Sequence, residues 1–204
     1  MSGRKSATAL LVAYDGVIWR HDDAATEMIE DRSGLAPGAI RSVAFAPVRA
    51  VPAMLGHISR AAWYESIAAG LADRAGGLET AEKIVEEWSA VRGGIVPELL
   101  DFVSAVRDRG VPVGICASGV DELPADLPSR VDTVVHAADI GLAAPHRDYF
   151  AAGCIALAVL PKRCLYVDFS PRNIAGARAA GLLAYRYAGV ESLSYLRHVF
   201  ATTA

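Results

Sequence analysis

Two aspartates, Asp15 and Asp168, stand directly after short apolar runs near opposite ends of the 204-residue chain. A carboxyl group at the end of a buried strand can act as a general acid or base, or can bind a cation. Its neighbours here are apolar, since Ala13 lies two positions before Asp15 and Phe169 follows Asp168. An apolar environment disfavours the ionised form of a carboxyl group, which suits a general acid near neutral pH. Asp15 is therefore the candidate catalytic residue; its alternative role is to accept main-chain N–H bonds within its turn.

Other residues at the ends of apolar runs define a candidate ligand-binding cleft. In sheets of parallel strands, ligands bind at the carboxyl ends of the strands. We predict a cleft lined by Ala13, Tyr14, Ala117, Ser118, Ala144, Asp168 and Phe169, with His57 added from a helical segment. Asp168 is expected to form hydrogen bonds within its own loop rather than to bind a cation. Ser170 is expected to cap the following helix, and Asn173 to tether neighbouring loops.

The elements that must position these residues alternate between strand and helix in the second half of the chain. Short runs rich in Val, Ile and Leu predict strands over 111–116, 132–135, 163–167 and 182–185, with a first strand over 7–12. The segments between them predict helices over 97–109, 147–159 and 171–180. Such alternation is typical of a parallel sheet covered on both faces. We therefore predict an α/β fold with a Rossmann-like parallel sheet.

The segment between the first strand and this series is wholly helical in pattern. Apolar residues at helical spacing predict helices over 24–32, 36–43, 60–75 and 80–91, with Ser59 as an N-cap. The simplest organisation is a core formed by 1–20 and 95–204, with a helical cap, 21–94, inserted after strand 1. Trp63 and Trp88 are interpreted as core residues of this cap.

The strand-end segments resemble the motifs of the haloacid dehalogenase superfamily, in the same order along residues 10–193. The matching segments are Val12–Val17 for DxDGV, Ile115–Gly119 for the Ser/Thr motif, Gly141–Pro145 with Tyr149–Phe150 for GxxKP…F, and Leu165–Asn173 for LFVDDSxxN. In the helical segment, Gly56–Ser59 and Trp63 are similar to the GxIT…W element of small-capped, phosphatase-like members. The resemblance implies a haloacid-dehalogenase-like core with a small helical cap.

The family's chemistry needs residue types that this chain lacks. A first aspartate attacks phosphorus, a second transfers the proton, a hydroxyl and a lysine neutralise the phosphoryl oxygens, and acidic residues hold Mg²⁺. The resemblance places Ala13 at the nucleophile, Ala117 (with Ser118 beside it) at the hydroxyl, Ala144 at the lysine and Phe169 at the second acid of the fourth motif. A methyl group cannot attack phosphorus, and dehalogenase members also need the first aspartate. We therefore expect neither activity, and we expect no metal and no cofactor.

The composition excludes several classes of partner. Apolar residues make up 53% and charged residues 21%, a globular balance. The net charge of −3 gives no basic footprint for nucleic acid, and no apolar run is long enough to span a membrane. The three cysteines, Cys116, Cys154 and Cys164, are expected to be buried free thiols in a reducing cytoplasm. By analogy with the family, whose cap surfaces offer dimer contacts, a homodimer is among the expected assemblies.

Two functional hypotheses stay open. In the first, the chain is a pseudoenzyme whose apolar cleft binds a small molecule or a protein partner. In the second, it is a repurposed, metal-independent enzyme in which Asp15 acts as general acid or base on a largely apolar metabolite, in a cyclisation, isomerisation or dehydration. Neither hypothesis is that of a conventional phosphohydrolase.

Overall fold

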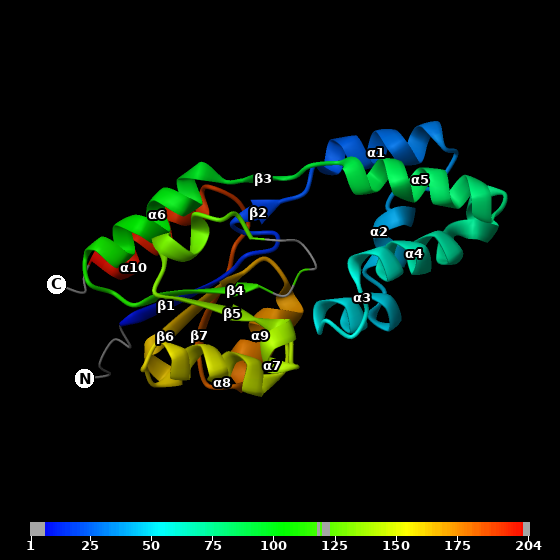
Figure 1. The fold of residues 1–204 in the computed structure, drawn as a ribbon. Helices are drawn as coiled ribbons and strands as arrows, with labels where there is room; N and C mark the ends of the chain where they lie inside the picture. Colours follow the sequence, from blue (N-terminus) through cyan, green and yellow to red (C-terminus); the bar gives the residue numbers. More distant parts are fainter. Residues whose placement is uncertain (1–6, 118, 120–122, 202–204) are drawn as a thin grey trace. The chain divides into compact units, whose positions relative to one another are not determined.

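The computed structural model describes residues 7–117, 119 and 123–201. Its central feature is a parallel sheet with the strand order β5-β4-β1-β6-β7 (Figure 1). The strands are β1 (Ala9–Ala13), β4 (Val113–Ala117), β5 (Thr133–His136), β6 (Cys164–Asp168) and β7 (Leu183–Arg186). This sheet confirms the α/β fold that the alternating sequence pattern predicts.

Helices cover both faces of the sheet. The helices α6 (Pro97–Asp108) and α10 (Ser192–Ala201) lie on one face, and α7 (Ala137–Ile140), α8 (Arg147–Ala156) and α9 (Pro171–Ala179) lie on the other (Figure 1). The short 3-10 turns η1 (Leu127–Arg130) and η2 (Pro161–Arg163) precede β5 and β6. Every residue of β1, β4 and β6 is buried. This burial explains their unbroken apolar sequences, because a strand covered on both faces has no side that meets water.

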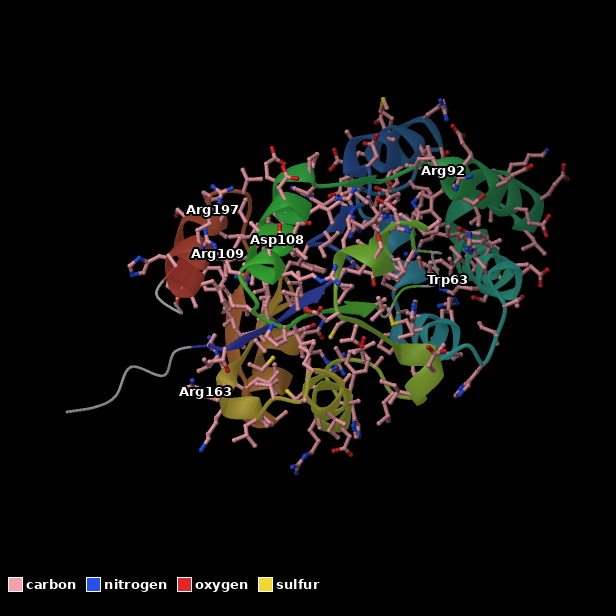
Figure 2. All side chains as sticks on the ribbon, turned by 60° about the vertical axis from the view of Figure 1, so that its left-hand side comes forward. Trp63, Arg92, Asp108, Arg109, Arg163 and Arg197 are labelled. Carbon is pink, nitrogen blue, oxygen red and sulfur yellow. The ribbon has the colours of Figure 1, made fainter. Side chains whose placement is uncertain are left out.

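The outer surface of the α6–α10 face is charged. Asp108 and Arg109 at the end of α6 and Arg197 on α10 are all exposed, and Figure 2 shows these side chains on the ribbon. Among the described residues, no helix is long and apolar enough to cross a membrane.

The structure divides into two compact units, one formed by the chain up to Arg20 and from Ile95 onward, the other by His21–Gly94. The short strands β2 (Trp19–Arg20) and β3 (Gly94–Ile95) pair where the chain passes between the units. The second unit, called the cap below, contains α1 (Asp23–Arg32), α2 (Ala39–Ala44), α3 (Pro47–Met54), α4 (Arg60–Ala75) and α5 (Leu78–Ala90).

Tryptophans form the centre of the cap. Trp63 and Trp88 are buried, with their ring centroids 6.0 Å apart, which confirms that they are core residues of this unit. The indole N–H of Trp63 donates to the main-chain oxygen of Ala44 at 3.1 Å. The Oγ of Ser59 accepts the N–H of Ala62 at 3.1 Å, so the predicted N-cap of α4 is also confirmed.

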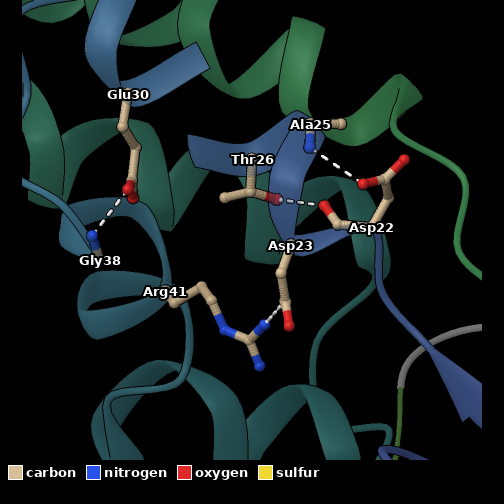
Figure 3. Close-up of polar contacts among 7 residues, drawn as sticks. All are labelled: Asp22, Asp23, Ala25, Thr26, Glu30, Gly38 and Arg41. Atoms are coloured by element: carbon tan, nitrogen blue, oxygen red, sulfur yellow. Dashed lines mark hydrogen bonds and ion pairs between the residues drawn. The ribbon is translucent and has the colours of Figure 1, made fainter. Parts of the chain in front are cut away.

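A buried carboxylate on α1 holds the start of α2 (Figure 3). Glu30 is 2% exposed and accepts the N–H groups of Gly38 at 2.6 Å and Ile40 at 2.8 Å. Because the N-cap residue of α2 is Gly38, the helix has no side-chain cap of its own, and Glu30 supplies the acceptor that the N–H groups at its start need. At the start of α1, Asp22 caps its own helix by accepting the N–H of Ala25 at 2.9 Å.

Three helices were not expected from the sequence, and one of them is the four-residue helix α7. In α3 the prolines that suggest chain breaks are tolerated: Pro47 stands in the first turn, where an N–H would have no partner, and Pro52 removes one bond near the helix end. The helix α10 follows the last predicted strand, in a segment for which the sequence pattern predicts no element.

Candidate functional site

The carboxyl ends of the strands bring most of the predicted site residues to one edge of the sheet. Ala13 ends β1, and the register that pairs Val12 with Val167 places it beside Asp168 at the end of β6. Ala117 ends the neighbouring strand β4, and both alanines are buried. The surface between these strand ends therefore carries methyl groups where an acid or a hydroxyl would supply oxygen atoms.

Asp168 is bound within its own loop. Its Oδ1 accepts the N–H of Ser170 at 2.7 Å, and its Oδ2 accepts the amide of Asn173 at 2.9 Å and the hydroxyl of Tyr166. The hydroxyl of Ser170 accepts the N–H of Asn173 at 3.4 Å at the start of α9. The expected hydrogen-bonding role of Asp168 and the cap by Ser170 are confirmed, and the amide of Asn173 bonds to Asp168 within the same β6–α9 segment.

Burial dominates the electrostatics of this carboxyl group. Removal from water raises the pKa of Asp168 above its ordinary value, and the hydrogen bonds from Tyr166, Ser170 and Asn173 offset only part of the rise. Burial, together with the charge of Asp168, also raises the pKa of Tyr166. Tyr166 therefore keeps its proton, and its hydroxyl donates a hydrogen bond to the carboxylate of Asp168.

The ring of Phe169 lies on the turn that follows β1. A Cβ added at Gly16 would stand 2.3 Å from two ring carbons of Phe169, so the ring packs directly on the glycine main chain. Gly16 has a φ of +75°, a conformation that glycine adopts without strain. The Phe169 side chain is nevertheless 45% exposed. One side of the ring thus covers the turn after β1, and part of it stays open to a ligand.

Asp15 lies next to Gly119 in this edge of the sheet. A Cβ added at Gly119 would stand 2.5 Å from Oδ1 of Asp15. Any residue other than glycine at this position would therefore displace the carboxylate. The turn around Asp15 is held by main-chain bonds, with the N–H of Gly16 donating to the oxygen of Trp19 at 2.7 Å. The rings of Tyr14 and Trp19 stack with centroids 6.1 Å apart. Tyr14 is buried beneath this turn and Asp15 is half-buried.

The loop that carries Ala144 is packed against α9. A Cβ added at Gly176 of α9 would stand 2.5 Å from the main-chain oxygen of Pro145, so loop and helix touch through their backbones. Ala144 itself is half-buried. Ser118 lies outside the described residues.

The last predicted cleft residue, His57, belongs to the cap. It is exposed, in the turn between α3 and α4. Cys116, Cys154 and Cys164 are buried free thiols, as expected. Burial raises the pKa of the Cys116 thiol, which suits a small apolar residue better than a nucleophile.

Sequence reasoning missed Arg186 at this edge. It ends β7, pairs in register with Asp168, and its Nε donates to the main-chain oxygen of Phe169 at 3.3 Å. The signal in the sequence was a cation directly after the predicted strand 182–185, at the same kind of position as Asp15 and Asp168. Tyr187 follows it, and its main-chain N–H donates to the oxygen of Asp168 at 2.9 Å.

Residues 11–181 match the family model of haloacid dehalogenase-like hydrolases. The chain belongs to this family. A haloacid dehalogenase family enzyme from Bacteroides thetaiotaomicron, solved with magnesium and inorganic phosphate, has a similar fold, with a TM-score of 0.68, 17% identity and coverage of 93% of this chain and 98% of that chain. A 2-haloacid dehalogenase from Pseudomonas syringae is also similar, with a TM-score of 0.62, 18% identity and coverage of 97% and 100%. No curated protein sequence matches the chain significantly.

The magnesium implied by the family does not fit the donors of this edge. Mg²⁺ is held in proteins by carboxylate oxygens in octahedral geometry, but both oxygens of Asp168 already accept hydrogen bonds from the protein. Phe169, which the resemblance places at the second acid of the fourth motif, supplies a ring instead of oxygen atoms. Among the described residues, no group of three or more His, Cys, Asp or Glu side chains is arranged to hold a metal ion.

Proposed function

We propose that this haloacid dehalogenase-like protein is a pseudoenzyme that binds a small, largely apolar molecule at the carboxyl edge of its sheet. The observation that carries the proposal is the Phe169 ring, which packs on Gly16 beside Asp168 while 45% of the side chain stays exposed. An exposed phenyl ring in a strand-end site favours an apolar ligand, since burying it gains about 25 cal/mol for each Å² removed from water.

The rest of the edge supports a ligand without a phosphoryl group. Covalent phosphoryl transfer requires an oxygen nucleophile, and Ala13 offers a buried methyl group at the end of β1. Stabilising the transferred group requires cations or fixed donors directed at its oxygens. Asp168 instead brings negative charge. The N–H groups of Ser170 and Asn173 are not available to a ligand's oxygens, because they already donate hydrogen bonds to Asp168.

A neutral apolar probe tests the proposal. We expect 3-phenylpropan-1-ol to shift the amide resonances at the ends of β1 and β6 in two-dimensional NMR of the full chain. The Phe169→Ala variant should lose most of this response. Ile155→Ala is the matched control, because Ile155 on α8 is an apolar side chain that is 79% exposed. An equal response in wild type and Phe169→Ala would contradict the proposal.

A second function is favoured by the position of Asp15. Its half-buried carboxyl group stands at the same edge, in a place that depends on the missing side chain of Gly119. This arrangement supports a metal-independent enzyme in which Asp15 transfers a proton to or from a bound apolar metabolite.

Mass spectrometry of a small-metabolite extract incubated with the protein tests this second function. The proposal expects a conversion that is lost in Asp15→Asn and also in Gly119→Ala, whose Cβ would displace the carboxylate. A conversion that survives both changes, or no conversion by the wild type, would leave the binding function as the account of this site.

A further inference from the structure

The end of β7 adds a positive charge to the site. Arg186 is the last residue of this strand and pairs in register with Asp168, so it lies at the same carboxyl edge as Ala13 and Phe169. Its side chain is exposed. Its Nε donates to the main-chain oxygen of Phe169 at 3.3 Å, which holds the guanidinium group next to the residue whose ring forms the apolar surface.

This bond engages one N–H donor of the guanidinium group, and its acceptor is a neutral main-chain oxygen. Within the described part of the chain, Arg186 forms no ion pair. An arginine presents five N–H donors in a planar fork, and one of them is engaged with Phe169. The remaining donors match the two oxygens of a carboxylate, which arginine binds in a bidentate manner.

The negative charges nearby decide which anion fits. Asp168 ends the neighbouring strand β6, and Asp15 follows β1, the next strand beyond β6, so the edge combines carboxyl groups with the guanidinium of Arg186. A dianion such as a phosphate monoester would meet repulsion from these carboxylates, whereas a monoanion can be neutralised by one arginine. The apolar floor of Ala13 and Ala117 offers no donors to further oxygens.

We infer that the ligand is an apolar carboxylate, with its carboxylate on Arg186 and its apolar body on Phe169. The inference rests on the proposed function, because it assigns a specificity-determining residue to the same site. The carboxylate binds the guanidinium donors that Phe169 does not use. The body of the ligand then crosses the exposed part of the Phe169 ring toward the turn that carries Asp15.

Paired probes that differ only in the charged group test this assignment. Binding of 3-phenylpropanoate and of 3-phenylpropan-1-ol to the full chain is measured by NMR titration in wild type, Arg186→Gln, Phe169→Ala and Arg178→Gln. Arg178 is the matched control, since it is also exposed and also donates to a main-chain oxygen, that of Ala184 at 3.1 Å. Arg178 lies in the last turn of α9, away from the strand ends near which Phe169 lies.

The acid should bind the wild type about tenfold more tightly than the alcohol, as expected for one charge-assisted contact. Arg186→Gln should abolish this difference and leave the alcohol unchanged, while Arg178→Gln should leave both probes unchanged. If the acid keeps its advantage in Arg186→Gln, or has none in the wild type while the alcohol still binds through Phe169, the inference fails and the proposed function stands. If neither probe binds the wild type, or if Phe169→Ala binds the alcohol as well as the wild type does, the proposed function fails.

Discussion

At the scale of single residues, two buried tyrosine hydroxyls at the carboxyl edge differ in one respect. The hydroxyl of Tyr166 donates to Asp168, whereas that of Tyr187 has no hydrogen-bond partner among the described residues, although the side chain is only 4% exposed. A buried polar group without a partner lowers the free energy of unfolding by about 1–3 kcal/mol relative to a satisfied one.

The same deletion should therefore have opposite effects at the two positions. Tyr187→Phe should leave the free energy of unfolding unchanged or raise it by about 1 kcal/mol, and Tyr166→Phe should lower it by about 1–3 kcal/mol because Asp168 loses a donor. Urea unfolding of both variants measures the contrast. Equal losses in the two variants would mean that Tyr187 has a partner in solution.

The raised pKa of Asp168 gives a pH dependence with a defined sign. The ordinary pKa of an aspartate is 3.8, and the folded-state pKa of Asp168 lies above it. At pH values between these two, Asp168 holds its proton in the folded protein, whereas the unfolded chain has already lost it. The free energy of unfolding therefore falls as the pH rises from the ordinary pKa through the folded-state pKa, and is constant above it. Asp168→Asn removes this dependence, so the stability advantage of the wild type over the variant should narrow as the pH rises.

Urea unfolding of the wild type and Asp168→Asn at several pH values from about 4 to about 7 checks the sign. An advantage of the wild type that widens with rising pH would show that the hydrogen bonds from Tyr166, Ser170 and Asn173 outweigh burial.

At the scale of elements, the cap depends on a carboxylate that joins two helices. Glu30→Ala leaves the N–H groups of Gly38 and Ile40 without their acceptor at the start of α2. We expect a loss of about 2–4 kcal/mol, whereas Glu27→Ala, at an exposed position of the same helix α1, should change the stability by less than about 0.5 kcal/mol. Hydrogen exchange of the α2 amides measures the loss locally. Equal protection of α2 in the two variants would contradict the role of Glu30.

Family members that transfer phosphoryl groups use three loops together: those after β1 and β6 and the loop at Ala144. We therefore expect that introducing a single family residue will not give phosphatase activity. Ala13→Asp should give no Mg²⁺-dependent hydrolysis, because the new carboxylate would stand beside Asp168 with no added cation. Activity should require Ala13→Asp, Ala144→Lys and Phe169→Asp together. Steady-state assays of the single and triple variants test this, and activity in the single variant would show that the edge is less altered than proposed.

Much of this element order follows from pattern alone. Strands such as Leu10–Val12 and Leu165–Val167 are apolar without interruption, because both faces of the sheet are covered, and such runs are visible in a sequence. The helix α3 was missed because Pro47 and Pro52 suggest breaks, and their positions relative to the helix start decide whether they are tolerated. The contact of Arg186 with Phe169 was also missed, since only the pairing of β6 with β7 brings residues so far apart in the chain together.

At the scale of the whole molecule, the chain belongs to the haloacid dehalogenase-like family and carries Ala13 and Ala117 at the ends of two adjacent strands of its sheet. The match to the family over residues 11–181 includes the strand ends that carry Ala13, Ala117, Ala144 and Phe169. Structural neighbours below 20% identity share the fold and do not decide the chemistry. The residues at the strand ends are therefore the basis for the proposed function.

The hydrolysis of p-nitrophenyl phosphate in the presence of Mg²⁺ tests the central claim most directly. The account predicts that the wild-type protein gives no turnover above that of Asp15→Asn, because Ala13 cannot attack phosphorus and Asp168 is occupied by its own loop. A turnover number within the ordinary enzyme range of about 1–1,000 per second, abolished by Asp15→Asn, would contradict it.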